Sequence, residues 1–250
     1  MNCKIRSLIL SSIFISLSVI VGYYSKYLFL GYFSLKHAFL IFSSIILGPL
    51  YGAIIWSMND ILSNLFFNYV GIFWFDLNFF YMIEGSFPGV CLLMLNFIDK
   101  NKKHRLLFLI FLIFISGYFI IFLLINSSIE EIHLFYFRIL LNEKIIISFI
   151  TLICISYIGI IFLLNLFFKK WGILAGTIDI YSVAIIVLLN FIIFELIFFS
   201  LIFALHQEIS FKIFLLKRVI FAIKHIFLDT FFVSLLISAA NKNLYQTNSL

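Results

Sequence analysis

The sequence predicts an all-α integral membrane protein, a single domain over residues 1–250 built as a bundle of about eight transmembrane helices. Its composition is the first reason, because 64% of the residues are hydrophobic and only 11% are charged. A soluble domain of this size needs far more charge to cover its surface. The second reason is the regular recurrence of apolar runs near the roughly 20 residues that a helix needs to cross a bilayer.

Eight apolar segments are candidate spans, and they cover roughly residues 7–30, 36–48, 49–68, 79–97, 106–125, 145–168, 181–205 and 214–239. Lys4 and Arg6 precede the first segment, but no small-x-small cleavage site follows it, so a retained first helix is predicted. Only Gly48-Pro49 separates the second segment from the third. This dipeptide predicts a tight turn, because proline is tolerated at the start of a helix.

The distribution of cations predicts the orientation, since Lys and Arg collect on the cytoplasmic side. With the N-terminus inside, the dense clusters that fall inside are Lys4 and Arg6, Lys100 to Arg105, Lys169 and Lys170, and Lys242. The acidic pair Glu130 and Glu131 then falls outside. Both termini are therefore expected in the cytoplasm. The net charge of +6 suits cytoplasmic loops beside anionic lipid, so no nucleic-acid partner is expected.

The charged residues within the predicted spans include Asp60, Glu84, Glu195, Lys224 and Asp229. Exposure of such a group to lipid costs at least about 2.5 kcal/mol at the bilayer centre, so each should face the bundle interior. The acidic residues, taken singly, are expected to hold helices together by hydrogen bonds or ion pairs. The cluster at the outer start of the last span, Lys212, Lys217, Arg218 and Lys224, is different, because so many like charges need a shared anion. This cluster predicts an outward-facing site for an anionic solute.

Small residues four positions apart mark places where two helices approach closely. The chain has three such pairs, Ser12 with Ser16, Gly48 with Gly52, and Gly85 with Gly89. The glycine pairs are expected to pack within the chain. The serine pair is expected either to do the same or to contact another subunit.

The stretch from Leu35 to Gly89 carries a series of motifs in a distinctive order. They are Gly48-Pro49-Leu50-Tyr51-Gly52, then Asp60, then Gly71-Ile72-Phe73-Trp74, then Gly85-Ser86-Phe87-Pro88-Gly89. This order and spacing resembles the substrate-binding (S) component of energy-coupling factor vitamin transporters, most closely the folate branch. Where that branch usually has Pro-Gly-x-Thr, this chain has Phe75-Asp76-Leu77-Asn78.

The resemblance implies a six-helix core, here residues 7–97 and 181–239, with two inserted helices over 106–168. It also implies a bacterial plasma-membrane subunit, not an enzyme, that captures a folate-like anionic vitamin outside the cell. Ser12 and Ser16 would dock on a transmembrane coupling subunit, and two ABC ATPases would drive uptake. The chain itself has no Gly-x-x-x-x-Gly-Lys-Ser/Thr motif with which to bind ATP.

The chemistry of the residues suggests how such a site would bind a vitamin. Aromatic rings would stack on a planar ring system, amides would pair with its edges, and cations would bind its carboxylate. Lys36 and His37, in the first outer loop, would close over the solute. The expected substrate-binding residues are Lys36, His37, Phe73, Trp74, Asn78, Tyr81, Asn190, Lys217, Arg218 and Lys224. No metal or cofactor is expected, since Cys3, Cys91 and Cys154 have no ligand spacing.

Two alternatives stay open. A self-contained secondary transporter of a small anionic solute would show an internal repeat with broken helices in both halves, and only the first half has a Gly-Pro break. An intramembrane enzyme is suggested by Glu130-Glu131-Ile132-His133 with Arg138, although the arginine spacing differs from that of intramembrane prenyl-protein proteases.

Overall fold

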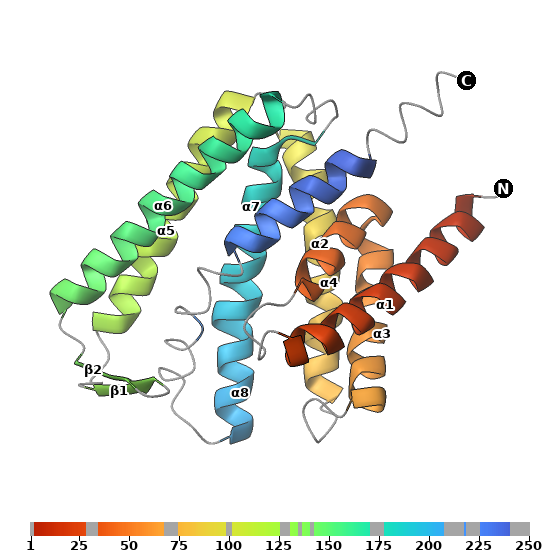
Figure 1. The fold of residues 1–250 in the computed structure, drawn as a ribbon, viewed down its shortest axis with the longest axis horizontal. Coiled ribbons are helices and arrows are strands. Elements are labelled where there is room, and N and C mark those ends of the chain that lie inside the picture. The colour runs from red at the N-terminus through yellow and green to blue at the C-terminus, as the bar shows by residue number, and fades with distance from the viewer. Residues whose placement is uncertain are drawn as a thin grey trace.

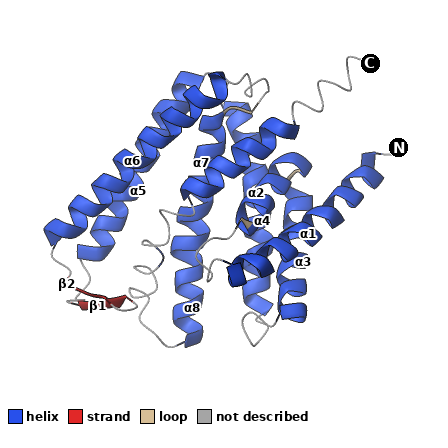
Figure 2. Ribbon diagram, viewed as in Figure 1, coloured by secondary structure: helices blue, strands red, loops and turns tan. Residues whose placement is uncertain are grey.

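The part of the chain that the structure describes is almost entirely helical (Figures 1 and 2). The computed structural model describes residues 3–28, 35–67, 75–98, 102–125, 131–134, 137–140, 143–170, 178–207, 218 and 226–240. Within this part, three helices are long and apolar enough to cross a membrane: Ile5–Ser25, Phe75–Phe97 and Ile180–Ile202. These findings agree with a helical membrane protein, while the number of spans and their orientation stay predictions.

The helices coincide closely with the predicted apolar segments. They are α1 (Cys3–Leu28), α2 (Lys36–Leu47), α3 (Pro49–Phe67), α4 (Phe75–Ile98), α5 (Lys102–Ile125), α6 (Glu143–Lys170) and α7 (Ile180–Asn190). A π-helical segment, η1 (Phe191–Phe198), continues α7 without a break into α8 (Phe199–Gln207). The last described helix, Ile226–Ala240, covers only the second part of the predicted segment 214–239.

A short hairpin that the sequence analysis does not predict lies between α5 and α6 (Figure 2). Its strands, β1 (Glu131–Leu134) and β2 (Phe137–Leu140), pair antiparallel, with His133 opposite Arg138. The acidic motif of the enzyme alternative therefore falls partly on a strand.

Helix α7 lies between the first part of the bundle, which contains α1 to α4, and the second part, the α5–α6 pair (Figure 1). It contacts α4 on one side and the α5–α6 pair on the other. Its side chains are buried along nearly its whole length, which is unusual for a helix and explains why its sequence is apolar on every face. Helices α5 and α6 thus pack on α7 through Leu109, Ile113, Tyr157 and Ile161.

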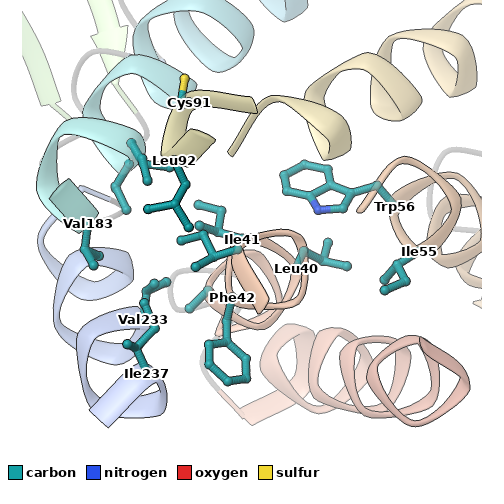
Figure 3. Packing of buried hydrophobic residues seen from close by; sticks show 14 residues of the cluster. Leu40, Ile41, Phe42, Ile55, Trp56, Cys91, Leu92, Val183, Val233 and Ile237 are labelled. Carbon is teal, nitrogen blue, oxygen red and sulfur yellow. The ribbon is translucent and has the colours of Figure 1, made fainter. Parts of the chain in front are cut away.

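The core of the first part surrounds α2 (Figure 3). Leu40, Ile41 and Phe42 of α2 meet side chains from α3, α4, α7 and the last helix, among them Trp56 and Val233. In a membrane, lipid is as apolar as a leucine side chain, so association of these helices depends on close packing more than on transfer from water. Several large apolar side chains on the outside, such as Phe97 at 92% exposed, have the character of a lipid-facing surface.

Helices α3 and α4 touch through their glycines. A Cβ atom on Gly52 would lie 2.2 Å from the backbone oxygen of Gly85, and one on Gly85 would lie 2.5 Å from the Trp56 ring. A Cβ on Gly89 would lie 2.7 Å from the backbone nitrogen of Pro49. Gly52 and both members of the Gly85–Gly89 pair therefore pack within the chain as expected, whereas a Cβ on Gly48 would meet nothing within 4 Å.

The Ser44 hydroxyl of α2 bridges two backbone groups of α4 beside Pro88. It donates to the Gly85 carbonyl at 2.7 Å and accepts from the Gly89 N–H at 3.1 Å. These two backbone groups would bond directly to each other in a regular helix, so the serine is inserted into the α4 hydrogen-bond ladder. This contact fixes the segment of α4 that carries Glu84.

The turn between α2 and α3 requires a glycine. Gly48 has φ of 91° and ψ of 172°, a region that residues with a Cβ essentially never occupy. Its N–H caps α2 by donating to the Ser44 carbonyl at 3.0 Å, and Pro49 then begins α3, as predicted.

Candidate functional site

A cavity of about 170 Å³ lies between four elements in the half of the bundle where α3 ends and α4 begins. The sequence analysis predicts that this half faces outward. The lining residues that the structure describes come from α2, α3, α4 and η1: Lys36, His37, Leu40, Trp56, Asn59, Asp60, Tyr81 and Glu195.

His37 is the centre of the polar contacts. Its Nδ1 lies 2.9 Å from Asp229 Oδ2 in the last helix, and its Nε2 lies 3.3 Å from Glu84 Oε1 in α4. The same Nε2 lies 3.9 Å from Glu195 Oε1. The Trp56 ring packs edge-on against the imidazole, with centroids 5.1 Å apart. One imidazole therefore joins three carboxylates from three different elements.

Glu84 is completely buried. Asn190 Nδ2 donates to its Oε1 at 3.1 Å, while its Oε2 has no hydrogen-bond partner among the described residues. A buried carboxylate oxygen of this kind costs free energy unless a proton, a cation or another donor satisfies it.

The π-helical geometry of η1 brings Asn190 and Glu195 to the same side. In an α-helix, residues five positions apart point about 140° away from each other. In a π-helix they are hydrogen-bond neighbours and lie nearly above one another, as the bond from the Phe199 N–H to the Phe194 carbonyl shows. The amide therefore reaches Glu84 while the Glu195 carboxylate reaches the cavity.

Asp60 and Lys36 also line the cavity. Asn78 Nδ2 donates to Asp60 Oδ2 at 3.1 Å, and Asn64 Nδ2 donates to Oδ1 at 3.2 Å. The oxygen of the Asn78 amide accepts from Ser57 Oγ at 2.9 Å, which fixes the amide in place. Lys36 Nζ lies 3.4 Å from Ser63 Oγ.

Arg218 pairs with Glu195 through its NH1 and the carboxylate Oε2. The guanidinium also lies over the Phe199 ring, 5.6 Å from the centroid, a favourable cation–π distance. Phe199 in turn packs on Tyr81, with ring centroids 4.9 Å apart. The sequence analysis expects the Arg218 charge to be met by a solute, whereas the structure meets it with a carboxylate of the chain.

The structure brings part of the predicted substrate-binding set together. Lys36, His37 and Tyr81 line the cavity, and Asn78, Asn190 and Arg218 contact its acidic residues. Lys36 and His37 do so from the first turn of α2, not from a loop as predicted. Some predicted residues lie outside the described residues: Phe73, Trp74, Lys217 and Lys224 of the binding set, and Gly71 of the motifs.

Sequence reasoning does not include the acidic members of the site in its binding set, although it recognises each of them as buried. It also leaves out Trp56 and Asn59, which line the cavity. Their helical spacing with Gly52 and Ser63 is the signal that could have found them, since all four are buried on one face of α3.

A second polar cluster lies at the other end of the bundle. Arg105 at the start of α5 is 5% exposed, and its NH1 lies 3.2 Å from Asp179 Oδ2 and 2.7 Å from Ser182 Oγ. Asp179 also caps α7 by accepting from the Ser182 N–H at 2.8 Å. The sequence analysis counts Arg105 among loop cations, but the structure buries it as a clamp between α5 and α7.

No protein-family model, curated protein or solved structure matches this sequence. The function must therefore be inferred from the motifs and from the geometry of the cavity.

Proposed function

We propose that the chain is the solute-binding subunit of an energy-coupling factor importer in a bacterial plasma membrane. The observation that carries the proposal is the cavity between α2, α3, α4 and η1, which is lined by charged and aromatic side chains. Ligand sites of helical bundles form between helices in this way. Charged groups inside a membrane bundle are costly and commonly mark a solute or ion pathway.

Three of the motifs that resemble the family, Gly48 to Gly52, Asp60 and Gly85 to Gly89, lie in or between the helices around this cavity. Gly48 and Pro49 set the angle between α2 and α3, and the contact of Gly52 with Gly85 sets the distance between α3 and α4. Those three helices contribute seven of the eight lining residues named above. The shared motifs thus support the position of the site, independently of which solute it binds.

The proposed solute is a planar vitamin with a carboxylate, as in the folate branch. Tyr81 and Trp56 offer aromatic surface, and Lys36 and Arg218 offer positive charge. A carboxylate that reached Arg218 would replace Glu195 as its partner. The cavity of about 170 Å³ is smaller than the roughly 300–1,000 Å³ of drug-sized ligand sites, so a whole vitamin binds only when side chains of the wall move apart.

The exposed face of α1 that carries Ser12 and Ser16 supports docking on a coupling subunit. Ser12 and Ser16 are exposed, and their hydroxyls donate to the α1 backbone at Leu8 and Ser12, so no polar atom of theirs needs an outside partner. Leu8 and Ile13 flank them and are also exposed. A stripe of small and apolar residues is the surface on which membrane helices associate. ATP would be hydrolysed by two ABC ATPases, since the chain has no P-loop motif.

The test is to purify the chain in detergent and to identify by mass spectrometry the small molecule that accompanies it. The proposal predicts one vitamin-class molecule per chain, displaced by excess folate and not by its neutral analogue. A chain that binds no vitamin would contradict it. A chain that moves solute across liposomes by itself would favour the secondary-transporter alternative.

A further inference from the structure

We propose that His37, Glu84 and Glu195 bind a divalent transition-metal ion, with Zn²⁺ as the typical case. One ligand atom from each of the three residues lies within 4.8 Å of the others. Bonds of about 2.0–2.2 Å to a metal separate neighbouring ligand atoms by roughly 3–3.5 Å. The distance from His37 Nε2 to Glu84 Oε1 is 3.3 Å, and that to Glu195 Oε1 is 3.9 Å. Small side-chain movements therefore complete the site.

Asp229 positions the imidazole for this role. When the Nδ1–H donates to Asp229 Oδ2 at 2.9 Å, the lone pair of a neutral imidazole is on Nε2, which faces the two glutamates. A carboxylate on the second nitrogen is the usual way in which proteins orient a metal-binding histidine. Arg218 acts similarly on Glu195, since it binds Oε2 and leaves Oε1 on the side of His37.

Buried oxygens supply a second, independent observation. Glu84 Oε2 and Asp229 Oδ1 are buried and have no hydrogen-bond partner among the described residues, and Glu84 is 0% exposed. Asn190 Oδ1, in the same cluster, is in the same state. Three oxygens without donors at one place, two of them on carboxylates, indicate a missing positive charge.

The charge balance of the described residues leads to the same result. Four carboxylates lie in or beside the cavity, those of Asp60, Glu84, Glu195 and Asp229. Lys36 and Arg218 balance two of them. With a neutral His37, two negative charges remain, and one divalent cation cancels them. The competing arrangement is a protonated His37 that forms ion pairs with Glu84 and Asp229 and binds no metal.

The ligand set selects the class of metal. One imidazole with two carboxylates suits Zn²⁺, Co²⁺ or Ni²⁺, whereas Mg²⁺ and Ca²⁺ prefer oxygen ligands alone. The adjoining cavity leaves room for a further ligand from water or a solute. Metal binding by these residues does not rest on the proposed function, and it holds for any solute.

The experiment uses the full chain in detergent, stripped with a chelator and then titrated with CoCl₂ and ZnCl₂. Metal content and the visible absorption of bound Co²⁺ are followed. One ion per chain is expected, with MgCl₂ unable to displace it. Glu84→Gln and Glu195→Gln, which keep the shape of the side chain, should lower the affinity at least tenfold, and His37→Gln should abolish the Co²⁺ spectrum. Asp229→Asn should lower the affinity about 10–100-fold, as other positioning residues do.

Asp76→Asn is the control, because this carboxylate is exposed at the start of α4 and is not among the residues that line the cavity. It should leave the Co²⁺ affinity unchanged. At the same concentration, Zn²⁺ should also raise the melting temperature of the wild type more than that of Glu84→Gln, since stabilisation by a bound ion falls as its dissociation constant rises. Absence of bound metal, or equal affinity in wild type, Glu84→Gln and Glu195→Gln, would overturn the proposal in favour of the protonated His37. Neither result bears on whether the chain binds a vitamin, which the mass-spectrometric test decides separately.

Discussion

Asn190 Nδ2 donates to Glu84 Oε1 across 3.1 Å, and so joins two residues that are 106 positions apart in the sequence. Asn190 ends α7 and Glu84 lies in α4, so this bond links the first part of the bundle to the long helix that begins at Ile180. The same glutamate lies against His37 of α2. The site is thus assembled where three helices meet, and a change in the packing of any one of them should alter it.

The first prediction concerns the packing of α3 on α4. Gly52→Ala and Gly85→Ala should each destabilise the protein by about 1–3 kcal/mol, because the new Cβ meets backbone or ring atoms that cannot move aside. Thermal unfolding in detergent measures this as a lower melting temperature. Gly159→Ala is the control, since a Cβ there meets nothing within 4 Å. Equal stability of all three variants would show that the close contact is wrong.

The second prediction concerns Arg218. Arg218→Ala should weaken binding of a carboxylated vitamin by about 1.5–3 kcal/mol, the usual loss for a charge-assisted hydrogen bond. Arg218→Lys should restore only part, because lysine keeps the charge and loses the planar fork. Titration calorimetry with a chelator present should show a much smaller loss for the neutral analogue.

Glu195→Gln provides the complementary change, since the proposed solute would have to displace Glu195 from Arg218. It should tighten binding of the carboxylated vitamin and leave the neutral analogue unaffected. If Arg218→Ala weakens both ligands equally, or if lysine substitutes fully, then Arg218 only anchors its segment at the membrane interface.

The third prediction concerns the face of α1. Ser12→Leu combined with Ser16→Leu should abolish co-purification of the coupling subunit, because larger side chains prevent close helix approach. Solute binding by the isolated chain should stay intact, since both serines are exposed. Ser156→Leu, at an exposed serine of α6 with the same type of backbone hydrogen bond, is the control. Unchanged co-purification of the double variant would exclude this face as the docking surface.

The fourth prediction concerns orientation. In a chain freed of its three native cysteines, a cysteine in place of Ile129 should react with a membrane-impermeant reagent from outside. One in place of Lys102 should react only after permeabilisation, because the Lys100 to Arg105 cluster is expected inside. Labelling of position 102 in intact cells would reverse the orientation and turn the cavity towards the cytoplasm.

Most helices could be predicted because apolar length alone determines them, and Gly48-Pro49 marks a turn that only those residue types form easily. The partners of the buried charges could not. Whether Arg218 meets a solute or Glu195 depends on helix packing, and the shared face of Asn190 and Glu195 depends on a π-helical segment that five-residue spacing does not reveal. The hairpin β1–β2 was missed because four-residue strands between two long apolar runs carry no distinctive pattern.

The most direct test of the central claim is uptake of labelled folate into proteoliposomes that contain the purified chain, with and without a coupling subunit and its two ATPases. The proposed function predicts accumulation only when the complete complex and ATP are present. It further predicts binding without accumulation when the chain is alone. Accumulation by the chain alone, driven by an ion gradient, would contradict the account and identify the protein as a secondary transporter.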